Sequence, residues 1–302
     1  MVFINVGKLK KIRNFTISKK TKVNFAEYTW YSKNKHAYAG YCWTPANDVK
    51  AVICLVHGLG EHSGRYHLWA ERFISEGYAV AAIDLRGHGK SALTTKNAVN
   101  IQQLLYDIHL LKVNAAALFP EKTLILYGHS MGGALALNYL VAHKNGFRKV
   151  IATSPWLELT FKPSWIKVFM ARLVSLVYPA FISSTGLNPE HLSRSHGVAE
   201  QYRNDPLVHD KITAGLFFNL QRAGKAIFNK RHKINTPILL MHGAADRITS
   251  PDATRRFSKN LALNSVLKIW SDCFHELHNE PEQDEIFAFM SQWLHGVLNN
   301  DR

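Results

Sequence analysis

The 302-residue chain has few cysteines, few acidic residues and no long apolar run. Its three cysteines, Cys42, Cys54 and Cys273, have unrelated spacings that form neither a disulfide framework nor a metal-ligand pattern. No apolar run approaches the ~18 residues of a membrane span, and the N-terminus places apolar residues before its charges, the reverse of a secretory signal. We therefore expect a cytoplasmic protein in a reducing compartment, with peripheral contact with a bilayer as the open alternative.

Acidic residues are outnumbered, because 37 lysines and arginines against 22 aspartates and glutamates give a net charge of +15. Such an excess favours anionic partners. Much of it lies in a basic leader, residues 1–22, for which we expect a solvated, poorly ordered segment. The alternative is an electrostatic contact with anionic lipid, worth about 1 kcal/mol per basic residue at most. No nucleic-acid-binding motif accompanies the charge, so we expect no nucleic-acid partner.

The remaining pattern predicts one large α/β domain with a mostly parallel sheet and helices on both faces. Two aromatic-rich, alternating segments between residues 23 and 43 predict antiparallel edge strands. Apolar runs predict further strands at residues 51–56, 78–83, 122–127, 149–153, 237–241 and 266–270. Helix-like segments alternate with them at residues 67–76, 100–119, 134–141, from 252 onward, and 284–297.

The alternation stops between residues 156 and 231, which contain amphipathic segments and no strand-like run. The clearest segment, residues 164–178, is apolar almost all round, and Pro163 and Pro179 suit the start and the end of a helix. We interpret this region as a helical cap inserted into a core made of residues 23–155 and 232–302. Its surplus apolar surface indicates an acyl channel or a lipid contact in addition to ordinary packing.

A strand, a Gly-x-Ser-x-Gly pentapeptide and a buried helix predict a nucleophile elbow at Ser130. Gly128 and Gly132 lack Cβ atoms, so the backbone can turn sharply enough to present the serine hydroxyl above the sheet. The pentapeptide alone is a weak signal, because small residues cluster by chance. The interpretation depends on a base, an acid and an oxyanion site in the right order.

Loops after two later strands supply the acid and the base. Asp246 follows the strand at 237–241 and His275 follows the strand at 266–270, which is the chain order of α/β-hydrolases. His275 would take the proton of Ser130, while Asp246 orients the imidazole and stabilises the imidazolium. His278 is the alternative base, and we prefer His275 because it lies nearer the strand end.

The strand at 51–56 runs into His-Gly-x-Gly, where hydrolases of this kind place an oxyanion donor. We assign the oxyanion hole to the backbone N–H groups of Leu59 and Met131, with a plain glycine turn as the alternative at the first position. His242 is expected to be a structural loop residue. The scattered histidines have no metal-ligand spacing, so we expect no metal and no other cofactor.

A second histidine-containing loop follows the strand at 78–83. Asp84 precedes Ser130 in the chain, so it does not fit the position of the catalytic acid. We expect Asp84, Arg86 and His88 to fix their loop by local hydrogen bonds.

These motifs together resemble monoacylglycerol lipases and lysophospholipases of the α/β-hydrolase superfamily. The resemblance rests on residues 57–66, 84–91, 128–133, 154–155, 202–207, 243–247 and 275–280, with Gly-Glu-His-Ser-Gly-Arg-Tyr at 60–66 the most specific. It covers residues 25–297, cap included. It implies hydrolysis of single-chain acyl glycerides under a mobile, lipophilic cap, and it supports Ser130, Asp246 and His275 by position.

The resemblance also implies a polar wall near the glycerol end of the substrate, formed by Glu61, Arg65, Tyr202 and His278. His129, inside the elbow, is a further candidate for substrate binding. Leu59 departs from the smaller residue often found at its position, which would narrow the acyl pocket without affecting its N–H.

The sequence thus predicts a serine hydrolase that cleaves monoacylglycerol or a related small lipid ester through an acyl-enzyme on Ser130. A lysophospholipase, a general carboxylesterase and an acyltransferase are alternatives in the same scaffold. A non-enzymatic lipid-binding protein is disfavoured, because every reactive position is present. No oligomeric state is predicted.

Overall fold

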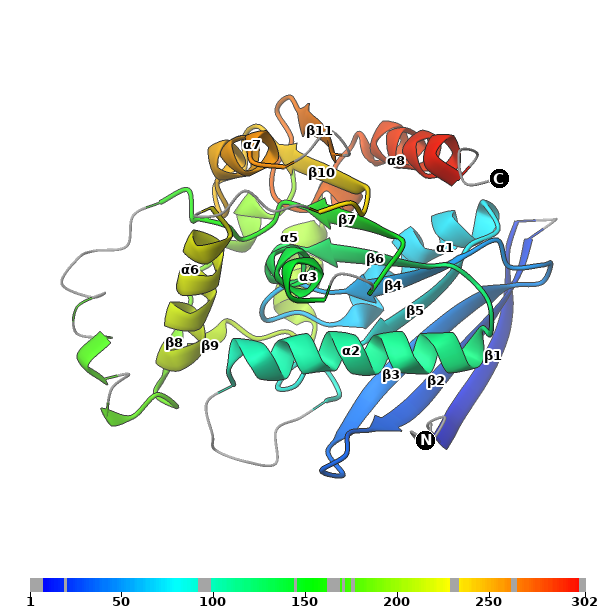
Figure 1. The fold of residues 1–302 in the computed structure, drawn as a ribbon, viewed down its shortest axis with the longest axis horizontal. Helices are drawn as coiled ribbons and strands as arrows, with labels where there is room; N and C mark the ends of the chain where they lie inside the picture. Colours follow the sequence, from blue (N-terminus) through cyan, green and yellow to red (C-terminus); the bar gives the residue numbers. More distant parts are fainter. Residues whose placement is uncertain are drawn as a thin grey trace.

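The computed structural model describes residues 8–18, 21–91, 99–143, 146–161, 169, 172–174, 177–228, 234–261 and 265–298. Within them a central sheet of nine strands has the order β1-β2-β3-β5-β4-β6-β7-β10-β11 (Figure 1). Three antiparallel strands form one end, β1 (Lys8–Ser18), β2 (Thr21–Tyr31) and β3 (Ala37–Pro45). The parallel strands are β4 (Val52–Val56), β5 (Ala79–Ile83), β6 (Leu124–His129), β7 (Lys149–Thr153), β10 (Ile238–Gly243) and β11 (Ser265–Trp270).

Helices cover both faces of this sheet (Figure 1). One face carries α2 (Ile101–Leu118), α3 (Met131–Ala142) and α7 (Pro251–Lys259); the other carries α1 (His67–Ser75) and α8 (Gln283–Leu298). Along β4, Val52, Cys54 and Val56 join the core under α2 and α3, whereas Ile53 and Leu55 join the core under α1. Because both faces are buried, the strand is apolar at every position.

The predicted α/β-hydrolase architecture is confirmed, and each predicted parallel strand lies within two residues of its observed bounds. Short 3₁₀ helices connect some elements: η1 (Ser63–Tyr66), η2 (Pro189–His191) and η3 (Leu277–Asn279). No helix in the described part of the chain is long and apolar enough to cross a bilayer.

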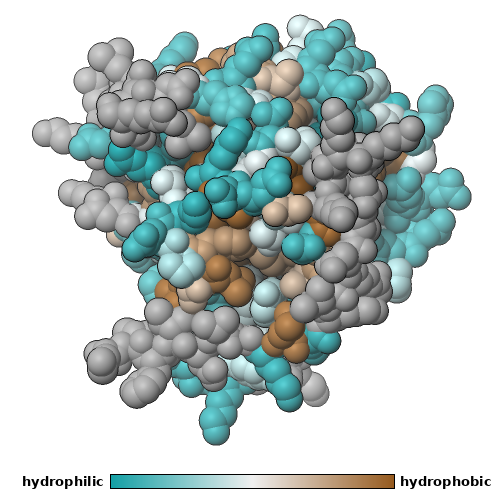
Figure 2. All heavy atoms as spheres, turned by 90° about the vertical axis from the view of Figure 1, so that its right-hand side faces the viewer, coloured by the Kyte–Doolittle hydropathy of each residue, from teal (hydrophilic) through white to brown (hydrophobic). Residues whose placement is uncertain are grey.

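The structure differs from the expectation of a poorly ordered leader. Residues Lys8–Ser18 form β1, which pairs antiparallel with β2 and makes it an interior strand. β3 is interior as well, because it lies between β2 and β5. The free edge of β2 offers unpaired N–H and C=O groups, and a further strand satisfies them. Figure 2 views the molecule from the side of β1, where hydrophilic side chains surround a smaller group of apolar ones.

We call residues 156–231 the cap segment. Its described elements include η2, β8 (Ile182–Ser184), α5 (Val198–Asn204), β9 (Lys211–Thr213) and α6 (Ala214–Phe228). We expected no strand here, yet β8 and β9 form a short antiparallel pair. Most of the helix predicted at 164–178 lies outside the described residues.

Candidate active site

Ser130 occupies the turn between β6 and α3 with φ of +53° and ψ of −115°. A residue other than glycine seldom adopts such a backbone conformation, which costs about 1–3 kcal/mol. A Cβ atom on Gly128 would lie 2.3 Å from the carbonyl oxygen of Gly132, and one on Gly132 would lie 2.2 Å from that of Val56. Both glycines of the pentapeptide are therefore required by close backbone approach.

Asp246 and His275 form a buried pair at the ends of β10 and β11. The Nδ1 atom of His275 lies 2.7 Å from Asp246 Oδ2, and both residues are 3% exposed. The backbone N–H groups of Ile248 and Thr249 donate to the other oxygen, Oδ1, at 2.7 and 3.0 Å. The carboxylate is thus fixed from both sides.

The charges of Asp246 and His275 shift the pKa of each other in the direction that favours the ion pair. Burial raises the pKa of Asp246, but His275 and His242 outweigh burial and hold that pKa well below its usual range. Burial lowers the pKa of His275, but the neighbouring Asp246 charge outweighs it and raises the pKa. The imidazole is therefore a stronger base than an isolated histidine.

Ser130 and His275 line the same cavity, which has a volume of about 1110 Å³. The ring of His129 lies beside that of His275, with centroids 4.8 Å apart, and also lines the cavity. Because the carboxyl ends of parallel strands meet at one edge of a sheet, residues far apart in sequence converge here. The structure thus brings Ser130, Asp246 and His275 to one end of the sheet.

The loop after β4 lies against Ser130, since a Cβ atom on Gly58 would be 3.3 Å from the serine Cβ. The Gly58 N–H is already occupied by Glu61 Oε1 at 2.6 Å. Within the residues that the structure describes, the N–H groups of Leu59 and Met131 have no hydrogen-bond acceptor. These two donors are thus available to an oxyanion.

Three of the four residues predicted for the polar wall line the cavity: Glu61, Arg65 and Tyr202. The Arg65 guanidinium bonds to Glu61 and to Glu276 at 2.6 Å each, and it lies 5.0 Å from the centroid of the Tyr202 ring. Burial raises the pKa of Glu276, but Arg65 outweighs it and lowers the pKa. Sequence reasoning missed Glu276, whose only signal was its place beside His275.

His278 does not line the cavity. Its ring stacks on Tyr66 with centroids 4.6 Å apart, and neither ring nitrogen has a partner among the described residues. It is 3% exposed, and neither of its ring nitrogens is bonded to Asp246. The structure therefore places His278 behind the cavity wall, away from the position of a catalytic base.

In the loop after β5, Asp84 forms the expected hydrogen bonds, whereas Arg86 binds a residue outside the loop. Asp84 accepts hydrogen bonds from the Ser63 N–H, the Lys90 N–H and the Tyr41 hydroxyl, each at 2.9 Å. Arg86 instead reaches out of the loop and pairs with Asp107 of α2 at 2.5 Å. Neither residue lines the cavity.

One group of possible metal ligands occurs among the described residues: Cys273, Glu280 and Glu282. Arg194 donates to both carboxylates, so a side-chain cation already supplies the positive charge that these groups need. The arrangement is that of an ion-pair network.

The chain is also similar in sequence and in structure to known hydrolases. A family model described as serine aminopeptidase, S33, matches residues 47–282. The chain belongs to this hydrolase family. The monoacylglycerol lipase of Mycolicibacterium smegmatis is 30% identical over 273 residues, which cover 87% of this chain and 97% of that enzyme.

Two further matches agree. The crystal structure of Paleococcus ferrophilus monoacylglycerol lipase is 29% identical and superposes with a TM-score of 0.76 over 85% of this chain and 97% of that one. An abhydrolase domain-containing protein of Dictyostelium discoideum is 33% identical over 261 residues, 85% of this chain but 28% of that protein's length. The resemblance to monoacylglycerol lipases is thus confirmed.

Proposed function

We propose that the protein is a serine hydrolase that cleaves monoacylglycerol to glycerol and a fatty acid. The observation that carries this proposal is the Asp246–His275 pair, 2.7 Å apart, beside a large cavity that Ser130 also lines. An activated serine needs a base held by a third group, and we assign these parts to His275 and Asp246. The mycobacterial and archaeal relatives, named as monoacylglycerol lipases, support the choice of substrate.

The proposed mechanism follows from which atoms are engaged. Because Asp246 holds Nδ1 of His275, Nε2 is left to take the Ser130 proton as the hydroxyl oxygen attacks the ester carbonyl. The N–H groups of Leu59 and Met131 stabilise the oxyanion, each by about 3 kcal/mol. The imidazolium then protonates the departing glycerol oxygen, and water releases the fatty acid by the same steps in a second round.

The cavity lining suits an amphiphilic ester. Apolar side chains of the cap segment form much of the lining, among them Trp156, Leu159, Phe161, Val174, Phe181 and Phe217. Glu61, Arg65 and Tyr202 contribute a polar part, in which Arg65 contacts the other two. An acyl chain fits the first and a glycerol with its hydroxyl groups fits the second.

The charge of the polar part argues for a neutral head group over a phosphate-bearing one. Two carboxylates, from Glu61 and Glu276, face the single guanidinium of Arg65. A phosphate placed there would meet an excess of negative charge in a site of low dielectric. We therefore place monoacylglycerol ahead of lysophospholipid.

Assays of wild type and Ser130→Ala with monoolein, lysophosphatidylcholine and p-nitrophenyl acetate and butyrate test this proposal. We expect fastest turnover of monoolein, no turnover by the alanine variant, and labelling of wild type alone by a fluorophosphonate. Turnover confined to the acetate and butyrate esters would contradict the lipase assignment. Product analysis with excess glycerol separates hydrolysis from acyl transfer.

We further propose that residues 156–231 act as a cap that meets a lipid surface. Large apolar side chains of this segment are strongly exposed: Phe161, Phe169, Leu173, Val177, Tyr178, Phe181 and Ile182, at 44–89%. Phe161 and Phe181 also line the cavity, so the exposed surface continues into the site. Sedimentation with phosphatidylcholine vesicles tests the contact, and Phe181→Ser together with Ile182→Ser should weaken it.

A further inference from the structure

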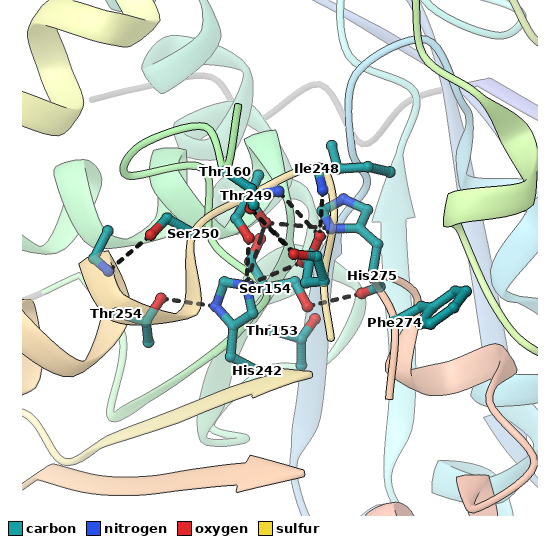
Figure 3. A network of polar contacts seen from close by, with 12 residues as sticks. Thr153, Ser154, Thr160, His242, Ile248, Thr249, Ser250, Thr254, Phe274 and His275 are labelled. Carbon is teal, nitrogen blue, oxygen red and sulfur yellow. Dashed lines mark hydrogen bonds and ion pairs between the residues drawn. The ribbon is translucent and has the colours of Figure 1, made fainter. Parts of the chain in front are cut away.

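One buried histidine beside the site has no part in the mechanism proposed above. His242 lies in β10 and is completely buried. Figure 3 shows its ring between Thr254 on one side and the group around Thr249 and His275 on the other. From the sequence alone we expect a structural loop residue at this position, but the contacts of His242 reach the carboxylate of Asp246.

The contacts of His242 fix where its proton lies. Its Nε2 atom lies 3.0 Å from Asp246 Oδ2 and 3.1 Å from the carbonyl oxygen of Thr249, and both atoms only accept hydrogen bonds. Nε2 must therefore carry a proton. Its Nδ1 atom lies 2.8 Å from Thr254 Oγ1, and in the neutral tautomer with the proton on Nε2 the threonine hydroxyl donates to it. A neutral imidazole satisfies every one of these contacts.

The two carboxylate oxygens of Asp246 have different hydrogen-bond partners. Oδ1 is held by the backbone N–H groups of Ile248 and Thr249. Oδ2 lies 2.7 Å from His275 Nδ1 and 3.0 Å from His242 Nε2, so two imidazoles share one oxygen. The hydroxyl of Thr249 approaches the same oxygen at 2.9 Å.

We propose that His242 is a positioning residue, which donates a hydrogen bond to the Asp246 oxygen that holds His275 and so sets the orientation and strength of that contact. The inference rests on the proposed function. A donor on Oδ2 restrains the oxygen laterally and draws part of its negative charge away from His275. Thr254 supports the arrangement from α7 by holding the far side of the ring.

The direction in which the pH profile of activity should move follows from the sharing of Asp246 Oδ2 by His242 and His275. Without His242, Oδ2 retains the Thr249 hydroxyl and His275 as partners, so more of its charge acts on His275. The imidazolium is then stabilised, and a higher pH is needed to generate the free base. The other groups that face His275 stay in place: His129 from β6, and His278, Glu276 and Glu61. The acidic limb of kcat/KM should therefore move to higher pH, while kcat falls because the carboxylate loses a restraint.

The decisive variants are His242→Leu, which removes the donor, and His242→Gln, whose amide offers an N–H in the same direction. We expect His242→Leu to lower kcat about 10-fold or more and to leave KM within about twofold of wild type. The acidic limb of its kcat/KM profile should move to higher pH. His242→Gln should recover most of the lost kcat and return the limb toward that of wild type. The assay uses whichever ester wild type cleaves, with Ser130→Ala as the blank.

A second pair of variants covers the case in which His242→Leu does not fold. Thr254→Val removes the hydroxyl at nearly constant volume, and Thr254→Ser keeps it; we expect kcat to fall in the first and not in the second. Equal losses for His242→Leu and His242→Gln, or for the two Thr254 variants, overturn the proposal in favour of simple packing. An unmoved acidic limb in all four variants also overturns it. If wild type is inactive on monoolein but active on another ester, only the substrate assignment is contradicted, and the proposal for His242 can still be tested with that ester.

Discussion

The backbone N–H of His209 donates a hydrogen bond of 2.8 Å to the carbonyl oxygen of Gly60. His209 belongs to the cap segment, and Gly60 follows Leu59 in the loop after β4. The cap segment is thus fastened onto the loop that carries one predicted oxyanion donor. Gly60 has φ of +75°, and a Cβ atom there would lie 2.2 Å from the carbonyl oxygen of His209.

We expect Gly60→Ala to lower the free energy of unfolding by roughly 1–3 kcal/mol and kcat by about 10- to 100-fold. Both the left-handed backbone and the contact with His209 oppose a side chain at this position. Urea denaturation and monoolein hydrolysis measure the two effects. Gly197→Ala is the matched control, because Gly197 has φ of +82° with no atom nearer than 3.9 Å. Equal losses of kcat in both variants would count against a role for the contact.

Removal of Arg65 should be strongly destabilising. Arg65→Met leaves the buried carboxylates of Glu61 and Glu276 without their cation, which costs about 3–5 kcal/mol. Adding Glu276→Gln should recover part of the loss, because it removes one unpaired charge. Denaturation of the single and double variants checks this, and a double variant less stable than the single one contradicts it.

The same variant should show a characteristic pH dependence. In wild type, Arg65 lowers the pKa of Glu276 against the effect of burial, so its contribution to stability is present at neutral pH and is lost as pH falls through that lowered pKa. In Arg65→Met the lowering by Arg65 is lost, and burial is opposed only by the weaker effects of His278 and the Asn279 hydrogen bond, so the pKa of Glu276 should rise. The stability deficit of the variant should therefore shrink between pH 7 and pH 5. A deficit that does not change with pH would contradict this.

The pH profile of activity should report the raised pKa of His275. Only the neutral imidazole can take the serine proton, so kcat/KM should fall on the acidic side with an apparent pKa above that of an ordinary histidine. Asp246→Asn removes the charge that raises this pKa. The limb should then move to lower pH while kcat falls about 10⁴-fold. A limb that moves to higher pH in Asp246→Asn would exclude this charge as the cause.

The two candidate bases can be separated directly. His275→Phe should abolish fluorophosphonate labelling of Ser130, because no base remains. His278→Phe should retain labelling and change the free energy of unfolding by less than about 1 kcal/mol, because its ring nitrogens have no partner and its ring stacks on Tyr66. Loss of labelling in His278→Phe alone would reverse the assignment.

The elements that the sequence predicted well are those whose signal is local. A strand buried on both faces must be apolar throughout, so β4, β5, β6, β7 and β10 are recognisable from their composition. The chain order of the loops after the strands points to Ser130, Asp246 and His275. Gly128 and Gly132 are needed because other backbone atoms approach them closely, and both glycines are visible in the pentapeptide itself.

What the sequence did not predict depends on partners distant in the chain. Glu276 is charged and looks solvent-facing until Arg65, 211 residues away, is seen to bind it. The strand β1 forms because β2 has a free edge, although its own composition favours solvation. His242 and His278 differ in role because a 3₁₀ turn after Glu276 directs His278 away from the cavity, while β10 directs His242 toward Asp246.

The position of β6 between β4 and β7 has a consequence for how the molecule opens. Strands in the middle of a sheet exchange their amide hydrogens only when the whole domain unfolds, whereas a two-stranded ribbon such as β8–β9 exchanges in small local fluctuations. The proposed nucleophile, Ser130, therefore follows a strand that is among the last parts of the protein to open, whereas Ser183, Ser184 and Ile212 of the cavity lining belong to one of the first. A partly denatured sample should lose lipid turnover at denaturant concentrations where the serine still reacts with a small phosphonate.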